Sequence, residues 1–285
     1  MGKGVAAALA KEAEVIIVAR SEERAKATVD ELGPNASYVL ADLARLADVR
    51  RVTEELHAQH DALDGIFVNA GLGYAAGRVE TEDGMDSHFQ VNYLSHFMLT
   101  LNLLDLLERS EHGGRVIFNV ASFGEMDWDD LQMERTWGYE RGIGQAMVAK
   151  RMLVARLHAL CRARDDSRVS FVGFQIPKTV WSNQINIIPW PMRFMATVVK
   201  LFGGFISIDD CGRIMAPLFT EPHASSLRRS GKLITEKKGA LVEIPDIDFV
   251  LDPAEQDRLW RVSLALSDDD ATRRIADQLV DKLAS

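Results

Sequence analysis

The feature of this sequence that most constrains its fold is the regular alternation of short apolar runs with longer segments of helical periodicity. The apolar runs are rich in β-branched residues, are too short for helices, and occupy residues 14–20, 37–41, 63–68, 115–122, 169–174 and 232–235. Helical segments alternate with them at residues 3–11, 22–32, 47–57, 86–108 and 208–219, and another carries Lys150 and continues to about residue 162. This alternation predicts an α/β fold with a doubly wound parallel sheet. Because no internal repeat or linker interrupts it, we expect residues 1–285 to form one domain.

Composition argues against several classes of partner. The chain carries a net charge of -9 and lacks a basic cluster, so it is a poor candidate for binding nucleic acid or an anionic membrane surface. No apolar run reaches the length of a membrane span. Cys161 and Cys211 show no metal-ligand spacing and fit a reducing compartment. The histidines show no metal-ligand spacing either, so we expect a cytoplasmic protein without a metal site.

Two polar residues mark the expected site. Ser122 ends the apolar run 115–122, and Lys150 lies on the helical segment that follows. Ligands of parallel α/β sheets bind just beyond the carboxyl ends of the strands. Ser122 is therefore expected to face the site, and Lys150 can reach it from a neighbouring helix.

Residues 115–150 resemble the active-site segment of the short-chain dehydrogenase/reductase family, in particular its retinol-dehydrogenase-like branch, in which a strand ends in a catalytic Ser and a Tyr-x-x-x-Lys helix follows. Residues 81–107 are similar to the family helix that carries a structural and catalytic Asn, here Asn92, whose amide takes part in a proton relay. The resemblance covers about residues 2–235. It implies a Rossmann-like fold and an oxidoreductase with Ser122, Lys150 and Asn92 in its active site.

The resemblance also implies a dinucleotide site. Asn69-Ala70-Gly71 is similar to the family's Asn-Asn-Ala-Gly, and the glycine would let the backbone approach the adenosine side of the cofactor. Arg20 stands where an acidic residue would bind a ribose 2′-hydroxyl, and an Arg there suits a 2′-phosphate, so NADP is expected rather than NAD. The positions that match the family's cofactor contacts are Gly2, Arg20, Asp42, Asn69, Ala70, Gly71, Lys150, Pro177 and Ser182.

The first departure from the family lies at the start of the chain. Family members open with a strand and Thr-Gly-x-x-x-Gly-x-Gly, and only Gly2 matches this motif here. The usual first strand, which lies in the middle of the sheet, is missing, and we interpret the sequence as shortened from a longer product. We also expect that the strands ending at Arg20 and Val68 do not pair with each other.

The second departure is Ala146, which stands four residues before Lys150 in place of the family's catalytic Tyr. Tyr139, in the preceding loop, is the candidate substitute. Lys178 follows Pro177 where the family usually has Gly, so a side chain lies where the nicotinamide amide is expected. Asp129-Asp130 could pair as acid and base, but loop structure is the favoured interpretation.

Two segments lie outside the core alternation. We expect residues 178–205 to be a packed excursion or a lid over an apolar substrate pocket, and a membrane-touching face is a third interpretation that its few basic residues, Arg193 and Lys200, disfavour. Residues 250–285 are expected to form a helical extension.

Three functions remain open. The first is NADP(H)-dependent oxidation or reduction of a lipophilic alcohol or carbonyl at a degenerate site. The second is a non-redox isomerase, lyase or cyclase on the same scaffold, with Ser122, Tyr139 and Asp129 as polar groups. The third is a non-catalytic subunit. A homodimer or homotetramer is expected, formed through the long helices around Asn92 and Lys150.

Overall fold

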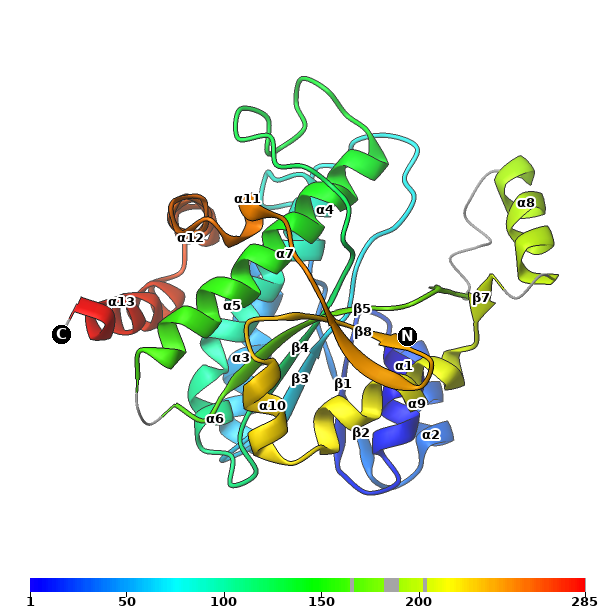
Figure 1. The fold of residues 1–285 in the computed structure, drawn as a ribbon, viewed down its shortest axis with the longest axis horizontal. Helices are drawn as coiled ribbons and strands as arrows, with labels where there is room; N and C mark the ends of the chain where they lie inside the picture. The colour runs from blue at the N-terminus through cyan, green and yellow to red at the C-terminus, as the bar shows by residue number, and fades with distance from the viewer. Residues whose placement is uncertain (165–166, 182–189, 202–203, 285) are drawn as a thin grey trace.

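The computed structural model describes residues 1–164, 167–181, 190–201 and 204–284, which form a Rossmann-like α/β fold around a mostly parallel sheet (Figure 1). The main sheet comprises β3 (Gly65–Val68), β4 (Arg115–Val120), β5 (Ser170–Gln175), β8 (Leu233–Lys237) and β9 (Ala240–Ile244), in that order. The first four strands run parallel, and β9 is antiparallel to β8. The prediction omitted β9 because its turn has Lys238 where such turns usually place Asn or Asp before the glycine.

Strands β1 (Val15–Ala19) and β2 (Ala36–Leu40) form a separate parallel pair. Within the ranges described above, no ladder joins β1 to β3, which confirms the expectation that these strands do not pair. Helix α1 (Gly2–Leu9) packs closely on α9 (Ile208–Thr220). A Cβ atom at Gly4 or Gly212 would lie 2.0 Å from a carbonyl oxygen of the other helix, so both glycines are needed for this contact.

The predicted helix 86–108 is divided into shorter pieces. These are α4 (Ser87–Phe89), a π-helical turn η1 (Gln90–Leu94), α5 (Ser95–Asn102) and α6 (Leu104–Glu108). The Asp86 carboxylate starts the series by accepting the main-chain N–H groups of His88 and Phe89. The other helices of this part of the chain are α2 (Glu22–Leu32), α3 (Leu46–Gln59) and the long α7 (Tyr139–Arg162). The π turn matters because it contains Asn92.

The C-terminal helices cover the outer face of α5 and α7 (Figure 1). After α10 (His223–Arg229) come α11 (Asp248–Leu251), α12 (Pro253–Ser267) and α13 (Asp270–Ala284). The Tyr93 hydroxyl lies 2.7 Å from Ser263 Oγ, and the buried Arg151 pairs with Asp246. The C-terminal helices thus cover part of the face through which a dimer was expected, and the oligomer itself stays a prediction.

The segment after β5 leaves the body of the molecule and returns to α9 (Figure 1). Its described parts are β6 (Thr179–Val180), α8 (Trp190–Leu201) and β7 (Phe205–Ile206), and β6 and β7 pair in parallel. Among all the described residues, no helix combines the length and the apolar character needed to cross a bilayer.

Candidate active site

The carboxyl ends of β3, β4 and β5 lie side by side, because these three strands are neighbours in one parallel sheet. Asn69 follows β3, Ser122 comes two residues after β4, and Gln175 ends β5. This edge is where ligands of such sheets bind. The sequence prediction therefore places Ser122 and the Asn69-Ala70-Gly71 loop at one edge, as the fold requires.

Asn92 holds the loop that follows β3. Its side-chain Oδ1 accepts the Leu72 main-chain N–H at 2.6 Å, and its Nδ2 donates to the Leu72 carbonyl at 3.1 Å. A Cβ atom at Gly71 would come within 2.9 Å of Asn92 Oδ1, so the loop needs glycine there. Both ends of the Asn92 amide are thus engaged by Leu72. The π turn places Asn92 inward, fully buried, at the height of this loop.

Two other amides at this edge have buried oxygens without a hydrogen-bond partner. Within the described residues, these are Asn69 Oδ1 beyond β3 and Gln175 Oε1 at the end of β5. A buried acceptor that stays unpaired is costly, so such atoms often mark the place of a ligand or water. Gly2 also lies here, because a Cβ atom at Gly2 would be 3.1 Å from Asn69 Nδ2. Sequence reasoning missed Gln175, whose position carries no motif.

Lys150 is fully buried on α7. Its Nζ donates to the Asn119 carbonyl at 3.3 Å, and no described carboxylate pairs with it. Burial lowers the pKa of the Lys150 amine to about 7. Burial, together with the nearby Lys150 charge, also holds the pKa of His96 well below its ordinary value. Lys150 can therefore gain or lose a proton near neutral pH, a property that the sequence did not reveal.

The position of the missing tyrosine is closed. Ala146 is fully buried within the hydrophobic core. Two residues before it, Gly144 meets the loop after β4 at Gly124, and a Cβ atom on either glycine would lie less than 3 Å from the other's backbone. Ser122, in the same loop, is exposed, and its hydroxyl has no hydrogen-bond partner in the described part of the chain. Ser122 thus remains available, while the loop after it packs tightly on α7 at Gly144 and Ala146 is enclosed by the core.

Tyr139 lies away from these residues. It begins α7, and seven residues separate it from Ala146, which corresponds to about 10 Å along a helix. Its hydroxyl donates to Glu140 Oε1 at 3.0 Å, and its ring packs edge-on against Tyr74 with the centroids 5.0 Å apart. The hydrogen bond to Glu140 raises the pKa of the Tyr139 phenol. The structure does not bring this phenol together with Ser122 and Lys150.

The Asp129-Asp130 pair builds the loop before α7. Asp130 is buried, and its carboxylate accepts the main-chain N–H groups of Glu134, Arg135 and Thr136. Against the cost of burial, these hydrogen bonds hold the pKa of Asp130 below its ordinary value. Asp129 is exposed. The interpretation as loop structure is confirmed.

The remaining expected cofactor contacts lie along the same edge. Arg20 is exposed directly after β1, and Asp42 follows β2, where its Oδ1 accepts the Ala44 N–H at 3.0 Å and shapes the turn before α3. Pro177 and Lys178 are exposed beyond β5. Ser182 lies outside the described residues.

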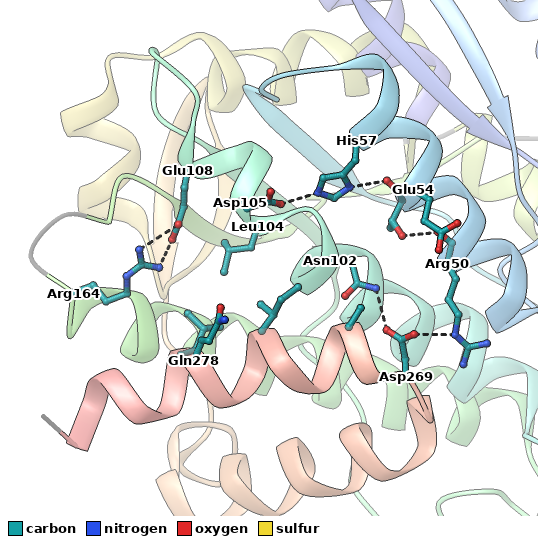
Figure 2. Close-up of a pocket in the computed structure, with 14 residues that line it drawn as sticks. Arg50, Glu54, His57, Asn102, Leu104, Asp105, Glu108, Arg164, Asp269 and Gln278 are labelled. Carbon is teal, nitrogen blue, oxygen red and sulfur yellow. Dashed lines mark hydrogen bonds and ion pairs between the residues drawn. The ribbon is translucent and has the colours of Figure 1, made fainter.

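A separate pocket of about 630 Å³ lies between α3, α5–α6 and α13 (Figure 2). Its charged side chains pair with one another: Asp269 with Arg50 at 3.0 Å, and Glu108 with Arg164. Glu108 precedes β4 and Arg164 precedes β5, so the pocket lies toward the amino ends of the strands. It is therefore distinct from the Ser122 edge.

Comparisons with known proteins agree with this arrangement. A sequence profile of short chain dehydrogenases matches residues 1–132. Human polyprenol dehydrogenase is 30% identical over 161 residues, covering 52% of this chain and 48% of the relative. Human retinol dehydrogenase 14 is 34% identical over 122 residues, covering 41% and 36%. The chain thus spans about half, or less, of the length of these relatives.

Solved structures share the fold. An uncharacterized protein from Mycobacterium paratuberculosis aligns with a TM-score of 0.68 at 20% identity, covering 93% of this chain and 90% of that one. The Pseudomonas aeruginosa RhlG/NADP active-site complex aligns with a TM-score of 0.64 at 21% identity, covering 84% and 91%. The chain belongs to the short-chain dehydrogenase/reductase family of oxidoreductases. Within it, the relatives place the chain in the retinol-dehydrogenase-like branch.

Proposed function

We propose that this protein is an NADP(H)-dependent oxidoreductase of lipophilic alcohols or carbonyls, in which Lys150 replaces the family's tyrosine as the proton-transferring group. The observation that carries the proposal is the buried Lys150 amine at the carboxyl edge of β4, with its pKa at about 7. A general acid works best when its pKa is near the operating pH. Ala146 cannot exchange a proton, so the site needs another group for this step.

The residues at the strand edge fit a dinucleotide. The unpaired Asn69 Oδ1 is an acceptor for ribose hydroxyls, and Gly2 lies beside the Asn69 side chain. Arg20, exposed after β1, would pair with a 2′-phosphate. When bound, the dinucleotide would supply or accept the hydride.

The chain's own residues would bind the substrate oxygen and transfer the proton. The exposed Ser122 hydroxyl would donate a hydrogen bond to the substrate oxygen, and Lys150 would hold the proton that this oxygen gains on reduction. Asn92 would keep the loop after β3 in place through Leu72. The names of the relatives, polyprenol dehydrogenase and retinol dehydrogenase 14, support a lipophilic substrate.

Calorimetric titration tests the cofactor. NADPH should bind more tightly than NADH, and Arg20→Glu should reduce NADPH affinity roughly tenfold or more, as expected for the loss of a charged hydrogen bond, with little effect on NADH. Consumption of NADPH with a long-chain aldehyde should accompany binding. Absence of binding by either dinucleotide would refute the proposal.

A second candidate is a non-redox or non-catalytic role. It is favoured by the complete burial of Ala146 within the hydrophobic core, which leaves little room for a phenol at the family's position. This candidate predicts that neither dinucleotide binds and that no NADPH is consumed with any aldehyde. The same titration therefore separates the two.

A further inference from the structure

Helix α8 is the most exposed apolar element among the described residues. Trp190, Phe194, Met195 and Leu201 are 68%, 58%, 59% and 81% exposed, although side chains of these types are usually buried. The helix stands apart from the body of the molecule (Figure 1), and no described helix or strand packs extensively against it. Contiguous exposed apolar surface of this kind marks an interaction site.

The apolar side chains of α8 are grouped by the helical period. Trp190, Phe194 and Leu201 lie four and then seven residues apart, so they form one stripe. The Trp190 and Phe194 rings stack with their centroids 6.1 Å apart. Met195 and Val199 extend the apolar arc on the adjoining side. A helix presenting such a stripe can lie flat on a surface.

The contacts of Lys200 with the residues at the base of the segment, Trp181 and Phe205, determine which side of α8 faces outward. Lys200 Nζ lies 4.0 Å above the Trp181 ring, and Trp181 packs edge-on against Phe205 with the centroids 5.1 Å apart. Trp181 also donates its main-chain N–H to Ile206 at 3.0 Å. The Lys200 side of the helix therefore faces Trp181, and the Trp190–Phe194–Leu201 stripe is directed away from it, into solvent.

The charge of the segment that contains α8 indicates what kind of surface would cover this stripe. The chain has 42 acidic residues, yet none occurs in the sequence between Asp166 and Asp209, and the part of this stretch after β5 contains Lys178, Arg193 and Lys200. In an acidic protein, this segment is a local basic region. Aromatic and aliphatic side chains flanked by Arg and Lys, without acids, are the composition of helices that lie in the interface of an anionic bilayer.

We infer that α8 docks the protein onto a lipid bilayer bearing anionic headgroups, with the Trp190–Phe194–Leu201 stripe inserted among the acyl chains. Tryptophan favours this interface. The segment begins at the carboxyl end of β5, beside Gln175, so docking would hold the candidate active site close to the bilayer. Delivery of a lipophilic substrate from the bilayer rests on the proposed function, whereas docking itself does not. From the sequence, a membrane-touching face was disfavoured because Arg193 and Lys200 are few. The exposure of the apolar side chains of α8, which the sequence does not reveal, now favours it.

Flotation of the full chain with vesicles tests the inference. Vesicles of phosphatidylcholine containing about one-quarter phosphatidylserine should carry the native chain upward. The triple variant Trp190→Ser, Phe194→Ser, Leu201→Ser should lose binding at least about tenfold, because it removes most of the inserted apolar surface. The matched control, Ile247→Ser with Leu251→Ser, also changes exposed apolar residues and should bind like the native chain.

A charge variant and a spectroscopic readout sharpen the test. Arg193→Gln should weaken binding to the phosphatidylserine vesicles about fivefold, with little change on phosphatidylcholine alone, and Lys11→Gln should not. Vesicles should shift the tryptophan emission of the native chain to shorter wavelength, and Trp190→Phe should remove that shift.

Failure of the native chain to float, or equal flotation of the triple variant and its control, would overturn the inference. So would a triple variant that only converts a larger species to monomer in solution, since a second copy would then cover α8. NADPH titration of the same samples keeps the proposed function separate, because vesicle binding requires no cofactor.

Discussion

The β3 flank and the β4 flank of the candidate site, the loops that follow these two strands and the residues that contact them, differ in which of the family's residues they retain. On the β3 flank, the loop Asn69–Leu72 is held by Asn92 through two hydrogen bonds to Leu72, and glycine stands where the backbone must come close. On the β4 flank, the tyrosine is replaced by Ala146, and the loop after Ser122 closes on α7 at Gly144. The β3 flank therefore keeps the Asn92 contact with Leu72, whereas the β4 flank lacks the family's phenol.

The β4 flank still contains one group with the required chemistry, Lys150. Burying an amine without a carboxylate is costly, and this cost lowers its pKa. In our proposal, loss of the phenol does not remove acid–base chemistry from the site, because Lys150, one turn further along the same helix, takes over proton transfer.

The largest effect is expected from Lys150→Met, which removes the amine and keeps much of the side-chain volume. Turnover of NADPH with a long-chain aldehyde should fall by about 10² to 10⁴, the usual contribution of a general acid. Tyr139→Phe is the control, because the Tyr139 hydroxyl donates to Glu140, and it should change the rate less than about twofold. If Tyr139→Phe were the damaging substitution, the assignment of roles would be wrong.

A second test addresses the β3 flank through Asn92→Leu. This change leaves the Leu72 N–H and C=O groups without partners, and each buried unpaired group costs about 1–3 kcal/mol. We expect a loss of unfolding free energy of roughly 2–5 kcal/mol, measured by urea denaturation, with weaker NADPH binding.

Thr100→Val provides the matched control for Asn92→Leu. The Thr100 hydroxyl lies buried on α5 without a described partner, so its removal should cost little or even stabilise the protein. Equal losses in the two variants would show that Asn92 acts only as a packed side chain.

A third test uses the pH dependence of stability. The pKa of Lys150 is about 7 in the folded protein and 10.5 when unfolded, so between these values the unfolded chain binds one more proton. Stability should therefore rise with pH through this window, by up to about 1.4 kcal/mol per pH unit from this residue. Urea denaturation at several pH values in the window should show a smaller slope for Lys150→Met, and identical slopes would contradict the burial of a titrating amine.

The smallest effect concerns Ala146→Tyr, which restores the family residue. Because Ala146 is fully buried within the hydrophobic core, the larger side chain should cost about 1–3 kcal/mol of stability through overpacking. Thermal denaturation measures this cost, with Ala149→Gly as a size-reducing comparison. A stable variant with increased reductase activity would show that the core around position 146 readjusts readily.

Much of the fold could be predicted from the sequence because buried strands and amphipathic helices leave local signals. Residues 22–32 form a helix with the predicted bounds, and Ser122 lies at the predicted strand edge. The retained Asn92 could also be identified. Its π turn could not, since π turns are rare and no local sequence signal marks this one.

Other features arise only when distant segments meet. The unpaired oxygens of Asn69 and Gln175 and the lowered pKa of Lys150 depend on three-dimensional burial. The cover of α5 and α7 by α12 and α13 likewise follows from tertiary packing. For α8, the sequence shows apolar residues but not whether they are buried or bare.

The account is tested most directly by the pH profile of single-turnover NADPH oxidation with a long-chain aldehyde, compared between the native chain and Lys150→Met. The native rate should be highest where the amine is protonated and should fall as pH rises through about 7. The variant should be slow and should lack this break. Equal rates, or the same break in the variant, would show that another group transfers the proton.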